Sequence, residues 1–290
     1  QNYGTPASGT RKILISVTGL SLENPTSNLV LAESVIRIEI DDIATSSGEE
    51  EAPLPILLAG GSIGVNGNLE IVGNGHANGF WNITGGNNTI TGQLTSSSGS
   101  SGLKGSSIPV TSQITVPLVT EVYAQHLSPP GGFTTCNANN FTNGGTYYCS
   151  NNVTISKNLT GVTIVSQGNI TVNSSVFNAT VVSLGTMTIG QSAQLGSETA
   201  PVKIGSVGSF GINGGGNINI WGDLLVNGAL SRNGGGQSRI TGSVRSSGSM
   251  TWNGQLRVFG VSGGSGGNPG GDDDTTTYRR TIVEWRELNT

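Results

Sequence analysis

The sequence predicts a mainly β protein in which a parallel β-solenoid is inserted into a small antiparallel sheet domain. The main observation is a recurring apolar-polar-apolar triplet whose copies start at residues 153, 170, 187, 202, 218 and 250. The steps are 17, 17, 15 and 16 residues, and the last interval of 32 equals two steps of 16. Alternation within a triplet places two side chains on one face, as a half-buried strand requires. A unit of about 16 residues is too short for a helical repeat and suits one coil of a solenoid.

Corner residues between the triplets support the same fold. Gly168-Asn169, Gly185-Thr186, Gly216-Asn217 and Gly248-Ser249 stand directly before triplets, and such residues form tight turns. Second strands fit at 162–165, 181–184 and 224–226. No triplet can bury its apolar face alone, so stacked coils would form one thin core. An antiparallel sandwich or barrel is the competing fold, but regular spacing and few Asn-Gly hairpin turns favour the solenoid.

The elements follow in order along the chain. Residues 12–18 and 27–43 read as strands, and the second half of 27–43 alternates cleanly. An acidic linker with Pro53 and Pro55 follows, and less regular coils, expected to cap the solenoid, run from 63 to 94. A loop rich in Ser and Gly at 95–107 leads to an excursion at 108–150 that contains four prolines and both cysteines. After the coils, a Gly-rich linker precedes a last alternating strand at 278–288.

These elements predict two domains. Residues 1–59 and 263–290 form the sheet domain, and residues 60–262 form the solenoid with the excursion at 108–150. The net charge is -5 over residues 1–59 (eight acids, three bases), +3 over 60–262 (four acids, seven bases) and -2 over 263–290 (five acids, three bases). Only 10% of residues are charged, so the surface is largely Ser, Thr, Asn and Gln, as is typical of secreted or cell-surface proteins.

The two cysteines, Cys136 and Cys149, frame a loop of 14 residues. In an exported chain they predict a disulfide that stabilises by roughly 3 kcal/mol, with free thiols as the alternative. No run of 18 apolar residues occurs. Because the chain starts at Gln1 rather than Met, we expect that an upstream signal or anchor was removed.

The closing strand, Ile-Val-Glu-Trp-Arg-Glu-Leu at 282–288, resembles the last strand of large minor pilins of the type IV pilus, the PilX-like group. A β region rich in Gly and Asn precedes that strand in the group as well. The resemblance implies a subunit at or near the pilus tip that acts in DNA uptake, the competence function, with other pilins as partners. It also implies an N-terminal hydrophobic helix that anchors the protein in the membrane, which this chain lacks.

Four arginines and one tryptophan in the late coils are the candidate DNA-contacting residues. The DNA-binding set is Arg232, Arg239, Arg245, Arg257 and Trp252, with Trp221 nearby. Arginines that follow phosphates beside exposed aromatic rings are what single-strand binding needs. The alternative is four solvated arginines and two tryptophans that close the core.

Other polar groups give weaker signals. The acids of the repeat region, Glu70, Glu121, Glu198 and Asp223, are scattered, and His76 and His126 lie outside the regular coils without a nucleophile motif, so no catalytic residue is assigned. Asp272 to Asp274 read as a solvated linker rather than a calcium site, and no metal or cofactor is expected. Glycosylation sequons stand at Asn82, Asn87, Asn140, Asn152, Asn158, Asn169, Asn173 and Asn178. A chain this rich in Asn, Ser and Thr contains many sequons by chance, and corner turns or ladders are the favoured alternative for these asparagines.

The sequence therefore predicts a non-enzymatic, surface-displayed minor pilin of a type IV pilus that takes part in DNA uptake. One rival is a carbohydrate-binding adhesin in which Trp81, Trp221 or Trp252 stacks on sugars. The other is a β-helix enzyme that degrades polysaccharides.

Overall fold

The computed structural model describes residues 10–22, 30–43, 54–101, 107–190, 193–260 and 279–289. The chain divides into two compact units, residues 1–52 with 272–290 and residues 53–271. In the first unit, strands from both ends of the sequence share one antiparallel sheet of order β1-β2-β26. Its strands are β1 (Thr10–Leu22), β2 (Val30–Ile43) and β26 (Arg279–Asn289).

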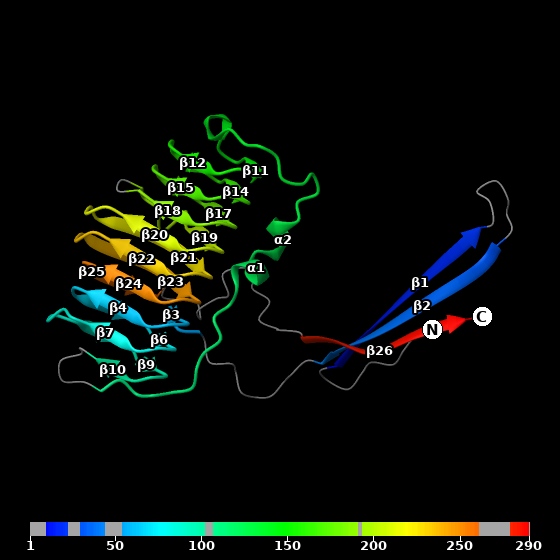
Figure 1. The fold of residues 1–290 in the computed structure, drawn as a ribbon, viewed down its shortest axis with the longest axis horizontal. Coiled ribbons are helices and arrows are strands. Elements are labelled where there is room, and N and C mark those ends of the chain that lie inside the picture. Colours follow the sequence, from blue (N-terminus) through cyan, green and yellow to red (C-terminus); the bar gives the residue numbers. More distant parts are fainter. Residues whose placement is uncertain are drawn as a thin grey trace. The chain divides into compact units, whose positions relative to one another are not determined.

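The second unit is a parallel β-solenoid whose coils have three faces (Figure 1). The first face is a nine-stranded sheet. In spatial order it consists of β12 (Val153–Ile155), β15 (Ile170–Val172), β18 (Met187–Ile189), β20 (Phe210–Asn213), β22 (Leu230–Asn233), β24 (Met250–Asn253), β4 (Ile63–Asn66), β7 (Trp81–Ile83) and β10 (Ser100–Ser101).

The second and third faces are joined because two long strands, β21 (Ile218–Val226) and β23 (Gln237–Ser246), run through both. The second face also holds β13 (Leu159–Thr160), β16 (Val176–Phe177), β25 (Gln255–Phe259), β5 (Leu69–Val72) and β8 (Thr89–Thr91). The third face also holds β11 (Thr146–Cys149), β14 (Thr163–Ser166), β17 (Ala179–Ser183), β19 (Val202–Ser206), β3 (Leu57–Ala59), β6 (Gly75–Ala77) and β9 (Leu94–Ser96). Gly222, with φ of +133°, lies where β21 passes from one face to the other.

The ladders between the described strands of this unit are parallel, which confirms the solenoid and excludes the antiparallel sandwich. Inward side chains stack in apolar columns from coil to coil. One such column runs Val153, Ile170, Met187, Phe210, Leu230, Met250, Ile63 and Trp81, and each of these side chains is buried.

The spatial order of the coils differs from their order in the sequence. The chain enters at β3 and β4 beside the last coil, since β24 pairs with β4 and β25 pairs with β5. It winds from there to β10 at one end of the stack, and then restarts at β11 and β12 at the other end (Figure 1). The coils at 63–94 therefore form one end of the solenoid, as expected, but they follow β24. The residues of β3, which the sequence analysis assigned to the sheet domain, belong to the solenoid.

Two of the six predicted triplets, those at 202–204 and 218–220, do not lie on the first face with the other four. The triplet at 202–204 lies in β19 on the third face, and the one at 218–220 lies in β21 on the second face. The first-face strands of those coils are β20 and β22 instead. Any Val-x-Ile triplet can occupy any face, so alternation by itself does not give the phase of a coil.

Serines with buried hydroxyl groups mark one corner of the coils. The column at the end of the third face contains Ser166, Ser183, Ser206 and Ser246. Their hydroxyls donate to corner carbonyls, as from Ser183 Oγ to the Gly168 oxygen at 2.8 Å. The carbonyls of Gly168, Gly185 and Gly228 also accept a backbone amide from the next coil, so each serine adds a second hydrogen bond at the corner and satisfies its own buried hydroxyl.

Residues 107–133, here called the strap, connect the two ends of the solenoid along its third face (Figure 1). The strap contains α1 (Val119–Val122) and α2 (Ala124–Leu127). Its buried Val116, Val119 and Tyr123 pack on outward side chains of the third face, among them Val182 and Leu225. The predicted excursion is thus a cover for this face.

Two asparagines of the coils fasten the strap. The Asn78 carboxamide donates to the Ile114 carbonyl at 2.9 Å and accepts from the Ile114 amide at 2.8 Å. The Asn227 carboxamide oxygen accepts from the Val119 amide at 2.8 Å, at the start of α1. No helix in the described part of the chain has the length or apolar character to cross a bilayer.

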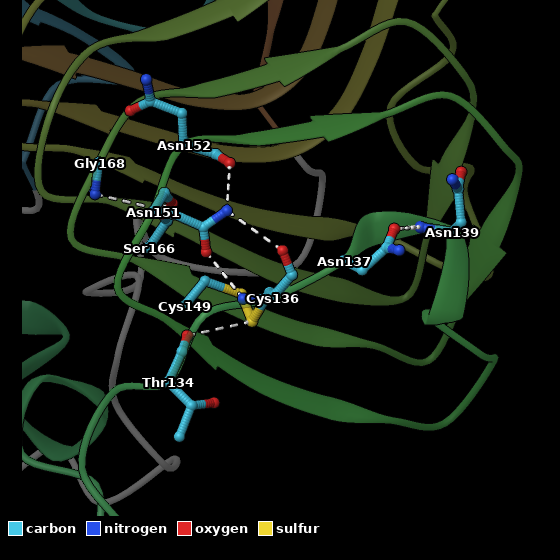
Figure 2. The surroundings of a disulfide bond; sticks show 9 residues. All are labelled: Thr134, Cys136, Asn137, Asn139, Cys149, Asn151, Asn152, Ser166 and Gly168. Atoms are coloured by element: carbon cyan, nitrogen blue, oxygen red, sulfur yellow. Dashed lines mark hydrogen bonds between the residues drawn. A yellow bond between two sulfur atoms is a disulfide. The ribbon is translucent and has the colours of Figure 1, made fainter.

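The predicted disulfide between Cys136 and Cys149 is confirmed (Figure 2). Cys149 is buried and pairs with Ser166, so it occupies the corner column that serines fill in other coils. The Asn151 carboxamide accepts from the Cys136 amide at 2.7 Å and donates to the Cys136 carbonyl at 3.1 Å. The loop between the cysteines, which includes the 3-10 helix η1 (Ala138–Asn140), packs Phe141 against Tyr147 at the β12 end.

Candidate functional site: an arginine and aromatic cluster on the second face

Three of the five candidate DNA-contacting residues are buried. Arg232 and Trp252 point into the core from β22 and β24, and Arg245 lies on the third face under the strap; each side chain has no exposed surface. These residues cannot contact a ligand on the surface of the folded solenoid, so their assignment to a DNA site is wrong. Arg239 and Arg257 remain accessible.

Arg232 has a structural role in the coil. Its guanidinium donates to the Gly216 carbonyl at 2.6 Å and to the Ser238 hydroxyl, which also accepts from the Trp252 indole at 2.8 Å. Burial lowers the pKa of Arg232 below its usual value. The arginine and Trp252 therefore order the Gly-rich corner between the first and second faces. The alternative in which Trp221 and Trp252 close the core holds for Trp252, whereas Trp221 is half-buried on the second face. Trp81, which the adhesin rival required on the surface, is also completely buried.

The accessible arginines belong to two adjacent outward columns of the second face. One column runs Asn219, Arg239, Arg257, Glu70 and Thr89, and the other runs Trp221, Thr241, Phe259, Val72 and Thr91. The columns are two residues apart on each strand, so their side chains lie on the same face. We call Trp221, Arg239, Arg257 and Phe259 the arginine-aromatic cluster.

The cluster is held together by contacts between cations and rings. The Arg239 guanidinium carbon lies 4.9 Å from the centre of the Phe259 ring and 5.9 Å from that of Trp221. Thr241 stands between the two rings in the aromatic column, and its small side chain leaves the room that Arg239 occupies. Arg257 lies over Phe259 at 5.3 Å. Such contacts hold exposed cations in place and stabilise by about 0.5–1 kcal/mol each.

Glu70 neutralises one of the two cations. Arg257 Nε donates to Glu70 Oε2 at 2.6 Å, and this hydrogen bond raises the pKa of Arg257. The side chains of the pair are 29% and 25% exposed, so solvent screens the interaction. Arg239 is exposed and none of the described carboxylates forms an ion pair with it. The cluster therefore presents one uncompensated positive charge beside a half-buried indole and a half-buried phenyl ring.

The other acids of the coils lie apart from the cluster. Asp223 is on the third face, where Oδ1 accepts from the Ser243 hydroxyl at 2.6 Å and from its amide at 3.1 Å. Glu121 bonds the Leu118 amide at the start of α1. Among the described residues, no three His, Cys, Asp or Glu side chains are grouped as metal ligands would be. Asp272 to Asp274 lie outside the described residues.

The structure corrects the expected position of His76 and adds Phe259 to the candidate residues. His76 lies within a regular coil, in β6, where its ring is buried and bonds Thr95 Oγ1 at 2.7 Å and Asn78 Oδ1 at 2.9 Å. Phe259 was missed as a cluster residue. Its spacing from Arg257, two positions along one strand, was the signal that both side chains share a face.

Several sequon asparagines act as corner ladders. Asn152 Oδ1 accepts from the Asn169 amide, and Asn169 Oδ1 accepts from the Thr186 amide, both at 2.8 Å. Asn158 Oδ1 accepts from the Ser175 amide at 3.1 Å. These side chains link successive coils, which fits the second of the two interpretations that the sequence left open.

No protein-family model matches this chain, and neither the search of curated proteins nor the search of solved structures finds a match.

Proposed function

We propose that this chain is a non-enzymatic minor pilin of a type IV pilus that displays its solenoid at the cell surface and takes part in DNA uptake. The resemblance of residues 282–288 to the PilX-like group and the position of the solenoid, in sequence, between strands of one antiparallel sheet support the pilin assignment. The solenoid then serves as a stiff body presented away from the pilus shaft. The resemblance implies other pilins as its partners and a hydrophobic helix as its membrane anchor.

The arginine-aromatic cluster is the proposed DNA contact. Arg239 is the observation that carries this part of the proposal, since its charge is accessible and lies between two rings. A single strand offers phosphates to the guanidinium and base faces to Trp221 and Phe259. Stacking of a base on an aromatic side chain contributes about 1–3 kcal/mol and tolerates any sequence. Binding is expected to be weak and independent of sequence.

Fluorescence anisotropy with a labelled oligothymidylate, measured over a range of salt concentrations, tests the DNA contact. Each phosphate contact on a single strand contributes about 0.7 to the magnitude of the slope of log K against log salt concentration. The double variant Arg239→Ala, Arg257→Ala should therefore reduce the magnitude of that slope by up to ~1.4. Glu70→Gln should strengthen binding because it releases Arg257. Lys203→Ala removes an exposed charge from the third face and is the matched control.

The outcomes are separable. No binding of the oligonucleotide by the unaltered protein at low salt refutes the DNA contact, as does equal weakening by Lys203→Ala and the double variant. The pilin assignment is tested by a different measurement, the presence of the full-length protein in pili sheared from cells. Its absence from the sheared pili would refute that assignment whatever the DNA result.

A further inference from the structure

The first face carries a second surface feature, which none of the preceding assignments uses. Its central outward column consists of small uncharged residues from coil to coil. In spatial order these are Thr154, Thr171, Thr188, Gly211, Ser231, Thr251, Gly64, Asn82 and Ser101. The face is therefore flat and free of charge along this column.

A shallow trough interrupts the column at Gly64. It is lined by Ser62, Gly64, Asn66, Phe80, Asn82 and Thr251, from the last three coils before β10. The floor is Gly64, where the column lacks a side chain between Thr251 and Asn82. Across three coils the trough extends about 10 Å along the solenoid axis, as two steps of ~4.8 Å.

Phe80 gives the trough an apolar wall. Phe80 directly precedes β7 and is 46% exposed, although Trp81, the first residue of that strand, is completely buried. Phe80 lies beside Ser62 in the neighbouring coil, and its amide donates to the Ser62 hydroxyl oxygen at 3.2 Å. That bond uses an acceptor position of Ser62 and leaves its O–H free to donate outward.

Neutral hydrogen-bonding groups form the remaining lining. Asn82 is exposed and its carboxamide forms no hydrogen bond with the described residues. Asn66 donates from Nδ2 to Asn253 Oδ1 at 2.8 Å, so its own Oδ1 can still accept. Amide and hydroxyl groups on both sides of an aromatic ring can bind a molecule that has alternating apolar and hydroxyl-bearing surfaces.

We propose that this trough binds a neutral polysaccharide, with the sugar chain running along the solenoid axis. Phe80 packs against the apolar face of one sugar ring, and Asn82, Asn66 and Thr251 bond hydroxyl groups of that ring and its neighbours. The lack of charge argues against nucleic acids and acidic polysaccharides, whose binding needs compensating cations. The site is on a different face from Arg239 and does not depend on the DNA contact.

The glycine floor allows a test that leaves the fold intact. A Cβ at Gly64 would have only the Met250 carbonyl oxygen nearby, at 3.8 Å, and its φ is outside the left-handed region. Gly64→Thr should therefore fold normally and fill the trough. Gly211 occupies the same column between Thr188 and Ser231, and a Cβ there would meet nothing within 4 Å. Gly211→Thr is the matched control because it adds the same side chain elsewhere on the face.

Calorimetric titration of the full chain with cellohexaose and with chitohexaose measures the interaction. We expect binding of at least one hexasaccharide, a loss of about tenfold or more in affinity for Gly64→Thr and Phe80→Ala, and a change within about twofold for Gly211→Thr. Binding of neither probe at millimolar concentration overturns the proposal. Equal affinity of Gly64→Thr and Gly211→Thr overturns it too.

The oligothymidylate measurement, repeated on the same variants, keeps the two proposals apart. Phe80→Ala should leave DNA binding unchanged, and the double variant of Arg239 and Arg257 should leave hexasaccharide binding unchanged. If Phe80→Ala instead weakens both interactions, the trough is not a separate site and the inference fails.

Discussion

Replacement of Tyr123 in the strap should separate packing from hydrogen bonding on the third face. The ring is 1% exposed and lies over Gly205, since a Cβ built at Gly205 would approach Tyr123 Cε2 to 2.8 Å. Its hydroxyl oxygen is buried without a hydrogen-bond partner among the described residues. The absence of a side chain at Gly205 therefore creates the space for the ring, and the ring attaches the strap.

The two variants have opposite expectations. Tyr123→Ala removes a large buried aromatic side chain, which typically costs 3–5 kcal/mol. Tyr123→Phe keeps the ring and removes a hydroxyl that has no partner, so its effect should lie between zero and a gain of about 1 kcal/mol. The difference between the variants should be about 3 kcal/mol or more.

Urea unfolding followed by circular dichroism, together with limited proteolysis, provides the assay. Because coils of a solenoid contact only their neighbours, the strap can detach before the coils unfold. We expect Tyr123→Ala to speed cleavage within residues 107–133 and to expose the third face to a hydrophobic dye. The claim that the Tyr123 ring attaches the strap would be refuted if the two variants differed by less than about 1 kcal/mol in stability and their straps were cleaved at equal rates.

The disulfide, Gly222 and the two buried or bonded tyrosines give three further predictions. Replacement of both Cys136 and Cys149 by serine should lower the stability of the β12 end of the solenoid by roughly 3 kcal/mol, as measured by hydrogen exchange. Equal protection of the amides at this end in the wild type and the variant would contradict the prediction. Gly222→Ala should prevent normal folding, because φ is +133° and the new Cβ would overlap the carbonyl of Val202 in the preceding coil; wild-type stability in calorimetry would contradict this. In an ultraviolet titration, Tyr147 should ionise at a lower pH than Tyr123, because hydrogen bonds with Thr142 lower the pKa of Tyr147 and burial raises the pKa of Tyr123; the reverse order would contradict this. The raised pKa of Tyr123 in the folded state means that its contribution to stability is complete below pH 10 and decreases above it.

The class of fold was predictable because alternation and corner residues are local. The triplets of β12, β15, β18 and β24 are first-face strands, and they predicted the parallel stack correctly. The phase of the coils with β20 and β22 was missed, although the sequence holds a signal for the first of them. Serine-x-glycine begins the corner in Ser183-Leu184-Gly185, Ser206-Val207-Gly208 and Ser246-Ser247-Gly248, each separated by one residue from a first-face strand. Before β22 the same place is taken by Val226-Asn227-Gly228, which lacks the serine.

The order of the coils was beyond local reasoning. Nothing in residues 57–66 indicates that they pair with residues 244–253, because parallel neighbours are fixed by side chains that stack across coils and not by the sequence between them. Local sequence also does not show which side chains point inward, and this is why buried residues were assigned to the DNA site. Arg232 occupies an inward position between Ile212 and Trp252, and a charged residue at such a position is the exception to the usual pattern.

Cross-linking of engineered cysteines tests the central claim, the stacking of the early coils on the last one. Asn66 and Asn253 are register partners on adjacent strands, and their carboxamides are hydrogen-bonded at 2.8 Å. Cysteines at both positions are within the range of a disulfide and should cross-link rapidly under mild oxidation, as identified by peptide mapping. Ser101 and Thr154 lie in β10 and β12 at opposite ends of the same sheet and should not cross-link when replaced in the same way. A fast bond between positions 101 and 154, with none between 66 and 253, would show coils stacked in sequence order and contradict the account.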